Sequence, residues 1–240
     1  MSAVTGGAAG VPAAGIPAAA IPAAATPAAA TPARTVPASA IPAPGFPDAT
    51  RGAQAAFRAL LDALAHPTRI HPLTGPAEAP AGLGPGLGAV ALTVLDEESA
   101  LWLDPRRAAD AEVTSWLTFH TGARLVVDAS LADFVLADPA SLPPLADLAA
   151  GTDEAPHRSA TVLLDVRGAA GTRRVRAEGP GIDGHAIADA PWADDAFLDA
   201  WRANGTRFPR GVDLLLVDAG SVAGLPRTTR LRAADPRSEA

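Results

Sequence analysis

The chain has 240 residues and a formal net charge of -7, and much of its 48% hydrophobic content is alanine near the N-terminus. The acidic balance and the lack of a basic block argue against nucleic acid as a partner. The absence of cysteine excludes disulfides, thiolate metal sites, iron–sulfur ligation and a cysteine nucleophile.

The N-terminal segment is a five-residue repeat. Proline recurs at every fifth position from 12 to 47, with mostly alanine between. Proline at this spacing removes helical hydrogen bonds, and the small side chains cannot build a core, so residues 1–46 are predicted to be a disordered tail. No Lys or Arg precedes the first apolar stretch, so no export signal is indicated and a cytoplasmic location is expected.

The first predicted helix follows this tail. Its apolar stripe has the spacing i, i+3, i+4 and i+7, which is typical of one face of an amphipathic helix. The stripe consists of Phe57, Leu60, Leu61 and Leu64. Asp48 or Thr50 is expected to cap its start, and Pro67 to end it.

The next segment contains many glycines and then becomes apolar. Residues 82–88 carry four glycines, but Pro85 removes a backbone donor and no Lys-Ser or Lys-Thr pair follows, so a flexible loop is expected instead of a phosphate cradle. Residues 89–95 and 100–103 are predicted to be two strands joined by an acidic turn.

A second helix and two more strands follow. Val113, Trp116 and Leu117 indicate a helix that stops at Gly122, because glycine adopts the left-handed conformation at a helix end. Residues 125–127 and 133–136 are predicted to be strands.

The C-terminal part is predicted to contain a hairpin, a helix and a strand. Residues 160–166 form a buried type of strand, and a glycine-rich turn leads to residues 172–177, which suggests a β-hairpin. Asp194 and Asp195 are placed to start a helix that Asn204 and Gly205 end, and residues 214–217 form a strand. The order of elements predicts an α/β fold over residues 47–232, with a mixed central sheet and flanking helices, and a disordered C-terminus over residues 233–240.

Several kinds of chemistry are absent. All 19 basic residues are arginine, so no lysine can form an aldimine with pyridoxal phosphate or reach a nucleotide from a Walker loop. The five histidines form no close ligand pair, and no G-x-S-x-G elbow is present. The sequence therefore predicts no cofactor and no metal.

Three segments combine an anchor residue with polar groups: residues 119–121, 208–213 and 225–229. For Asp213 a role as an acceptor of loop N–H groups is weighed against binding or an interface. For Arg227 an ion pair is weighed against an anion or interface contact, and for His120 the favoured role is capping a helix end. The candidate binding or interface residues are His120, Thr121, Phe208, Arg210, Asp213, Arg227, Thr228 and Thr229.

Taken together, these segments resemble the PhnH family, a subunit of the bacterial carbon–phosphorus lyase system. The resemblance is carried by Phe57-Arg58 with Pro67, by residues 119–121, by Phe208-Pro209 through Leu214, and by residues 226–229. It covers about residues 47–232, whereas the repeat tail has no counterpart in the family pattern.

The resemblance implies a fold similar to that of pyridoxal-phosphate-dependent transferases, but without their cofactor site. It also implies a homodimer in isolation and a complex with the G, I and J subunits of the system. That complex joins a phosphonate to the ribose of a nucleoside triphosphate and releases the base. The family picture assigns this step chiefly to the I subunit and C–P cleavage to the J subunit, so this chain is expected to be a non-catalytic subunit.

Two alternatives stay open at this point. One is a hydrolase acting alone, with a triad that includes His120 and Asp213. The other is a protein that binds phosphonates or nucleotides through Arg227, Thr228 and Thr229.

Overall fold

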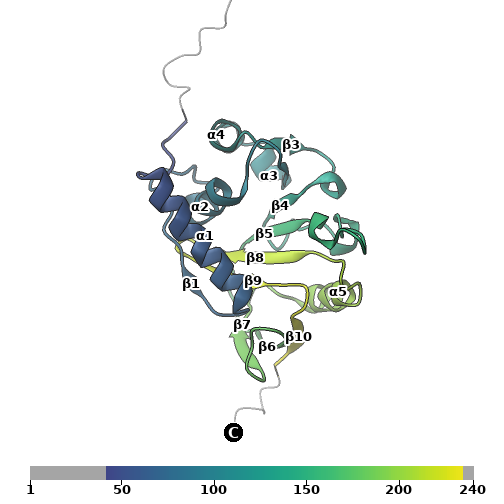
Figure 1. Ribbon diagram of the computed structural model, residues 1–240. Coiled ribbons are helices and arrows are strands. Elements are labelled where there is room, and N and C mark those ends of the chain that lie inside the picture. Colours follow the sequence, from purple (N-terminus) through teal and green to yellow (C-terminus); the bar gives the residue numbers. More distant parts are fainter. Residues whose placement is uncertain (1–41, 235–240) are drawn as a thin grey trace, which may run out of the picture. The chain divides into compact units, whose positions relative to one another are not determined.

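Helices and strands alternate along residues 42–234, the part of the chain that the computed structural model describes (Figure 1). The α-helices are α1 (Ala49–Ala65), α2 (Gly84–Val94), α3 (Pro105–Ala108), α4 (Ala111–Thr121) and α5 (Asp195–Gly205). The strands are β1 (His71–Pro72), β2 (Ala100–Leu103), β3 (Arg124–Val126), β4 (Phe134–Ala137), β5 (Thr161–Asp165), β6 (Arg174–Glu178), β7 (Ala186–Asp189), β8 (Asp213–Val217), β9 (Ser221–Leu225) and β10 (Arg230–Ala233). The connections between these elements contain the short 3-10 helices η2 (Ala129–Leu131), η3 (Leu145–Asp147) and η4 (Pro156–Arg158).

The main sheet is mixed. Its seven strands have the order β1-β9-β8-β5-β4-β2-β3, in which β3, β2, β4, β5 and β8 are parallel, and β9 pairs antiparallel with both β8 and β1. The prediction of an α/β fold with a mixed sheet and flanking helices is confirmed.

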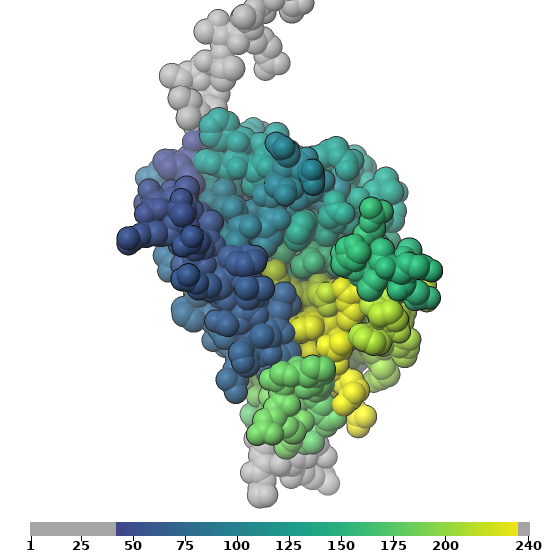
Figure 2. Space-filling model, viewed as in Figure 1, coloured from purple at the N-terminus to yellow at the C-terminus, as the bar shows by residue number. Residues whose placement is uncertain are grey.

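Side chains of successive residues in the central strands point to opposite faces of the sheet and pack into two separate hydrophobic cores. In β5, Leu163 packs against α1, α2 and α4, whereas Val162 and Leu164 face the side of α5 and the smaller sheet. All three side chains are completely buried. A strand covered on both faces is apolar throughout, which explains the continuous apolar run in the sequence. In Figure 2 the blue surface of α1 lies beside the yellow surface of the C-terminal strands, which agrees with the contact of α1 with β9.

The prediction for residues 82–95 is wrong. Residues 89–95 are not a strand, and much of the expected loop is helical, because α2 starts at Gly84 with Pro85 in its first turn. Because α2 is largely buried, its sequence does not alternate between apolar and polar residues with the period of a helix. Its apolar run therefore cannot be distinguished from that of a buried strand. A Cβ at Gly86 would lie 1.9 Å from the Asp218 carbonyl oxygen, so the glycine permits the helix to lie close to the sheet.

The predicted hairpin of residues 160–166 with 172–177 is also wrong. β5 lies in the middle of the main sheet between β4 and β8, so neither of its edges is open. β6 instead joins a three-stranded antiparallel sheet of order β10-β6-β7. The turn signal was read correctly, but strand pairing is decided by distant partners.

The predicted helix ends are confirmed. Asp48 caps α1 by accepting the Arg51 N–H at 3.0 Å, and Asp194 caps α5 by accepting the Phe197 N–H at 2.7 Å. Gly122 ends α4 with a φ of 71°, in the left-handed region where glycine carries no steric cost.

The folded unit extends beyond the predicted limits of 47 and 232. Ala43 and Phe46 pack against the first core, and the Ala234 N–H donates to the Arg174 carbonyl at 3.0 Å. The rest of the predicted tail, residues 1–41, and residues 235–240 lie outside the described part of the chain. None of the helices between residues 42 and 234 has the length and apolar character needed to span a bilayer.

Candidate functional site

Two networks centred on arginine lie at opposite edges of the parallel strands. One lies where β2, β4 and β5 end, and we call it the carboxyl-edge network. The other lies where β8 begins and β9 ends, and we call it the amino-edge junction. Ligands of open α/β sheets usually bind at the carboxyl ends of the strands, which is where the carboxyl-edge network lies. Several of the candidate residues predicted from the sequence instead lie at the amino-edge junction.

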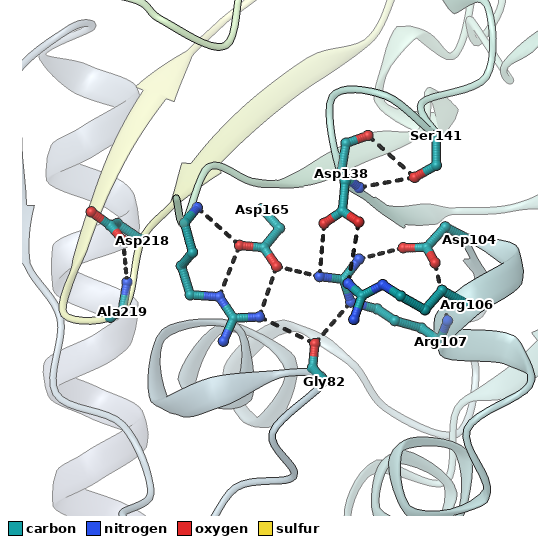
Figure 3. A network of polar contacts seen from close by, with 10 residues as sticks. Gly82, Asp104, Arg106, Arg107, Asp138, Ser141, Asp165, Asp218 and Ala219 are labelled. Atoms are coloured by element: carbon teal, nitrogen blue, oxygen red, sulfur yellow. Dashed lines mark hydrogen bonds and ion pairs between the residues drawn. The ribbon is translucent and has the colours of Figure 1, made fainter. Parts of the chain in front are cut away.

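Consecutive strand ends supply the carboxylates of the carboxyl-edge network (Figure 3). Asp104 directly follows β2, Asp138 directly follows β4, and Asp165 is the last residue of β5. Arg107 of α3, whose side chain is fully buried, lies among them and forms ion pairs with all three.

Most donors of the Arg107 guanidinium are used. Nη1 binds Asp104, Nη2 binds Asp165 and also Asp138 at 3.1 Å, and Nε donates to the Gly82 carbonyl at 3.0 Å. Arg167 binds the same Asp165 through Nε at 2.9 Å and Nη2 at 2.7 Å. The hydrogen bond with Asp165 raises the pKa of Arg167 above its ordinary value, although partial burial opposes this.

This network acts mainly as a structural clamp. It joins the segment before α2, through Gly82, to three strand ends, and its buried charges are paired with one another. A cavity of about 610 Å³ opens beside it, lined by Arg106, Asp138, Arg167 and Trp192 among others. None of these residues was among the candidates from the sequence, although an aspartate at the end of each of three strands was a readable signal.

The amino-edge junction is organised by Arg227, which follows β9. Its backbone N–H donates to Asp213 Oδ1 at 2.7 Å and its Nε to the same oxygen at 3.1 Å. Nη1 donates to the Pro156 and Pro209 carbonyls, both at 3.1 Å, and Nη2 to the Ser159 hydroxyl. Asp213 therefore accepts a loop N–H, the role favoured from the sequence, and Arg227 forms an ion pair, one of the two roles weighed for it.

Asn204 of α5 fixes the other side of this junction. Its side-chain amide donates to the Val212 carbonyl at 2.9 Å, and its oxygen accepts the Val212 N–H at 2.9 Å. The loop from α5 to β8 is thus held at both ends, while Phe208 at its tip remains 65% exposed. An apolar side chain held outward on a braced loop is suited to contact something else.

A groove of about 490 Å³ lies beside the junction, between α5 and β10. We call it the junction groove. Its lining residues are Pro180, Trp201, Arg202, Gly205, Thr206, Phe208, Arg227, Thr228, Thr229, Arg230, Leu231 and Arg232. The structure thus brings together four of the sequence candidates, Phe208, Arg227, Thr228 and Thr229, and joins Asp213 to them through Arg227.

The remaining candidates lie elsewhere. Arg210 forms an exposed ion pair with Asp153 at 3.1 Å. Thr121 donates to the Leu117 carbonyl at 2.7 Å within α4. His120 does not cap its helix as expected, because its Nε2 lies 2.8 Å from the Ala43 carbonyl, which also accepts the Trp116 indole N–H.

The hypothetical triad is not assembled among the described residues. His120 is engaged by Ala43 and packs against the rings of Trp116 and Phe119, whereas the carboxylate of Asp213 binds Arg227. A catalytic base needs hydrogen-bond reach to its partners, and these two side chains have other partners on different elements.

Comparison with known proteins agrees with the arrangement of motifs. The family model described as bacterial phosphonate metabolism protein (PhnH) matches residues 44–232. The chain is 38% identical over 187 residues to the alpha-D-ribose 1-methylphosphonate 5-triphosphate synthase subunit PhnH of Rhizobium meliloti, covering 78% of this chain and 93% of that protein. It is 34% identical over 178 residues to the putative C-P lyase subunit protein HtxG of Stutzerimonas stutzeri, covering 74% of this chain and 85% of that protein.

Proposed function

Because the chain belongs to the PhnH family of bacterial phosphonate metabolism proteins, we propose that it is a non-catalytic subunit of a carbon–phosphorus lyase complex. In this role it is required for alpha-D-ribose 1-methylphosphonate 5-triphosphate synthase activity, in which a phosphonate and ATP react and adenine is released. The observation that carries the proposal is the 38% identity to a synthase subunit across 93% of that subunit's length.

The chemistry of the side chains supports a role without catalysis. The sequence lacks lysine and cysteine, so it offers no Schiff-base amine and no thiolate ligand for an iron–sulfur cluster. Buried Arg107 and partly buried Arg227 have internal carboxylate partners, and the residues of the hypothetical triad have separate partners. The chain therefore contributes shape and contact surface, while its partners carry out the bond-making steps.

The proposed partners are the G, I and J subunits, and the isolated chain is expected to form a homodimer. A cytoplasmic location is part of the proposal, because the nucleoside triphosphate substrate is found there. The likeness to the fold of pyridoxal-phosphate-dependent transferases stays a prediction of the family resemblance; without a lysine, no internal aldimine can form.

The test is reconstitution of the complex. The tagged full chain is expressed together with the G, I and J subunits from the same genome, and the mass of the purified assembly is measured. Adenine release from ATP and methylphosphonate is then compared for assemblies with and without the chain. We expect the chain to be present in the assembly and adenine release to fall strongly when it is omitted.

A control with the chain alone separates the subunit role from independent catalysis. The purified chain is expected to release no adenine and to hydrolyse no phosphonate ester. Turnover by the isolated chain that is lost in His120→Ala would contradict the proposal and support an independent hydrolase.

A further inference from the structure

The junction groove lies between a helix and the free edge of a strand. β10 is an outer strand of the smaller sheet, β6 is its one strand partner within the described part of the chain, and α5 packs next to it (Figure 1). The helix and the strand edge form the two walls of a channel that runs along β10. An extended peptide of another protein can bind in such a channel beside the strand.

The register shows which backbone groups of β10 face this channel. The Ala234 N–H donates to Arg174, so residues 234, 232 and 230 form the hydrogen-bonded pairs with β6. In an antiparallel ladder the residues between them direct their N–H and C=O groups outward. Leu231 and Ala233 therefore present their backbone groups at the free edge, the arrangement to which a further strand can be added.

The groove has an apolar base and a cationic rim. Trp201 and Leu231 are buried against the second core, and Phe208 extends outward with most of its surface exposed. Among the described residues that line it, four are arginine and none is acidic, although the whole chain carries a net charge of -7. Trp, Phe and Arg are the residue types enriched at the centres of protein interfaces.

The positive charge extends to the outer face of β10. Arg230 and Arg232 occupy alternate positions, so they share this face with Arg176 and Glu178 of β6. The hydrogen bond from Arg176 lowers the pKa of Glu178 below its ordinary value, and the nearby charges of Arg232 and Arg230 act in the same direction. One carboxylate thus faces three guanidinium groups.

Thr229, one of the residues that line the groove, has an unusual buried hydroxyl. Thr229 is only 2% exposed, and its hydroxyl has no hydrogen-bond partner among residues 42–234, whereas its carbonyl accepts the Trp201 indole N–H at 2.8 Å. Buried hydroxyl groups are almost always hydrogen-bonded, so this unpaired hydroxyl is unusual, but its oxygen is itself enclosed by the groove wall.

We propose that the junction groove is the docking site for an extended, acidic segment of another carbon–phosphorus lyase subunit. The segment adds a strand to the free edge of β10, places an apolar side chain against Phe208 and Trp201, and directs carboxylates to Arg202, Arg230 and Arg232. A nucleotide fits less well, because the base of the groove is largely apolar and the strand edge offers main-chain pairing. The inference rests on the proposed role of the chain as a subunit.

The test compares two groove variants with a charge-matched control in the reconstituted complex. Phe208→Ala removes the exposed anchor, and Arg230→Glu with Arg232→Glu reverses the exposed rim charges. The control, Arg51→Glu with Arg58→Glu on the exposed face of α1, makes the same change in net charge away from the groove. All altered side chains are exposed, so each variant is expected to fold, which thermal melting of the purified chain verifies.

We expect Phe208→Ala to weaken binding to the partner subunits by about 30-fold or more, as loss of a central anchor does. The double Glu variant is expected to bind the partner subunits at least about tenfold more weakly. The affinity of the wild type and of the α1 control should fall as salt is added, whereas the affinity of the double Glu variant should not. A photo-reactive side chain at position 208 should cross-link to an acidic stretch of a partner.

The outcomes separate the two proposals. If the wild-type chain joins no partner, the subunit role itself fails. If it does, but both groove variants bind with wild-type affinity, only the docking site is overturned. A cross-link from position 208 to a second copy of the chain would overturn the docking site in favour of a homodimer surface. A cross-link in the purified chain that ATP suppresses would overturn it in favour of a nucleotide site.

Discussion

The carboxyl-edge network and the amino-edge junction both connect chain segments through an arginine side chain, at opposite edges of one sheet. Each places an arginine among carboxylates and backbone carbonyls at strand ends. Arg107 is fully buried and binds three carboxylates, whereas Arg227 is 13% exposed and binds one carboxylate, two carbonyls and a hydroxyl. The first arginine is enclosed by the fold, and the second lines a groove.

This difference shows why position in an α/β sheet is not enough to identify a site. The carboxyl edge is the usual place for ligands, yet here its charges are neutralised internally. At the amino edge Arg202 and Arg230 of the groove pair with Asp199 and Glu178, but these ion pairs are open to water, so the carboxylates of an occupant can compete for them. We expect the carboxyl edge to govern stability and the amino edge to govern assembly, and four substitutions test this contrast.

The largest effect is expected from Arg107→Met. Removing this guanidinium leaves the buried carboxylates of Asp104 and Asp165 without their main partner, which should cost about 3–5 kcal/mol in the free energy of unfolding. Urea denaturation followed by circular dichroism measures it. Arg106→Met is the matched control, because the neighbouring arginine is 60% exposed and should change stability by less than about 0.5 kcal/mol.

Arg227→Met should have a smaller effect on stability. The lost bonds to Asp213 and to the two carbonyls should cost about 2–3 kcal/mol, since the site is partly reached by water. The same denaturation measurement applies. A cost equal to or above that of Arg107→Met would contradict the ranking of the two networks.

Asn204→Ala tests how firmly the loop of the junction is held. The change leaves the N–H and C=O of Val212 without their partners inside the protein, at a cost of about 1–2 kcal/mol. Because this loop carries Phe208, we also expect weaker partner binding in the reconstituted complex. Normal binding despite the lower stability would show that the position of Phe208 does not depend on Asn204.

The smallest effect is expected from Thr229→Val, and it has the opposite sign. Replacing an unpaired buried hydroxyl by a methyl group of similar size should raise the stability of the isolated chain by about 0.5–1 kcal/mol. A loss of stability in the isolated chain would indicate that water already satisfies this hydroxyl.

Local signals in the sequence were sufficient for part of this fold. The cap of α1, the glycine end of α4 and the aspartate start of α5 each depend on residues within one turn, so these helix ends were predicted correctly. The predicted stripe of α1 is only partly right, because Phe57 and Leu61 are each 51% exposed and the buried face consists of Ala56, Leu60 and Ala63. The lack of lysine and cysteine likewise limits the chemistry without any structure. The segments around Phe208 and Arg227 were recognised from the sequence as candidates for the site. Their contact with each other was not predicted.

Tertiary structure decided the rest. α2 is buried on all sides and therefore lacks the helical period, and β6 turns away from β5 because β4 and β8 already occupy both edges of that strand. The Arg107 clamp and the junction groove are assembled from side chains far apart in the chain. Local conformational preferences can be read along a sequence, whereas burial and strand pairing depend on which distant segments compete for the same surface.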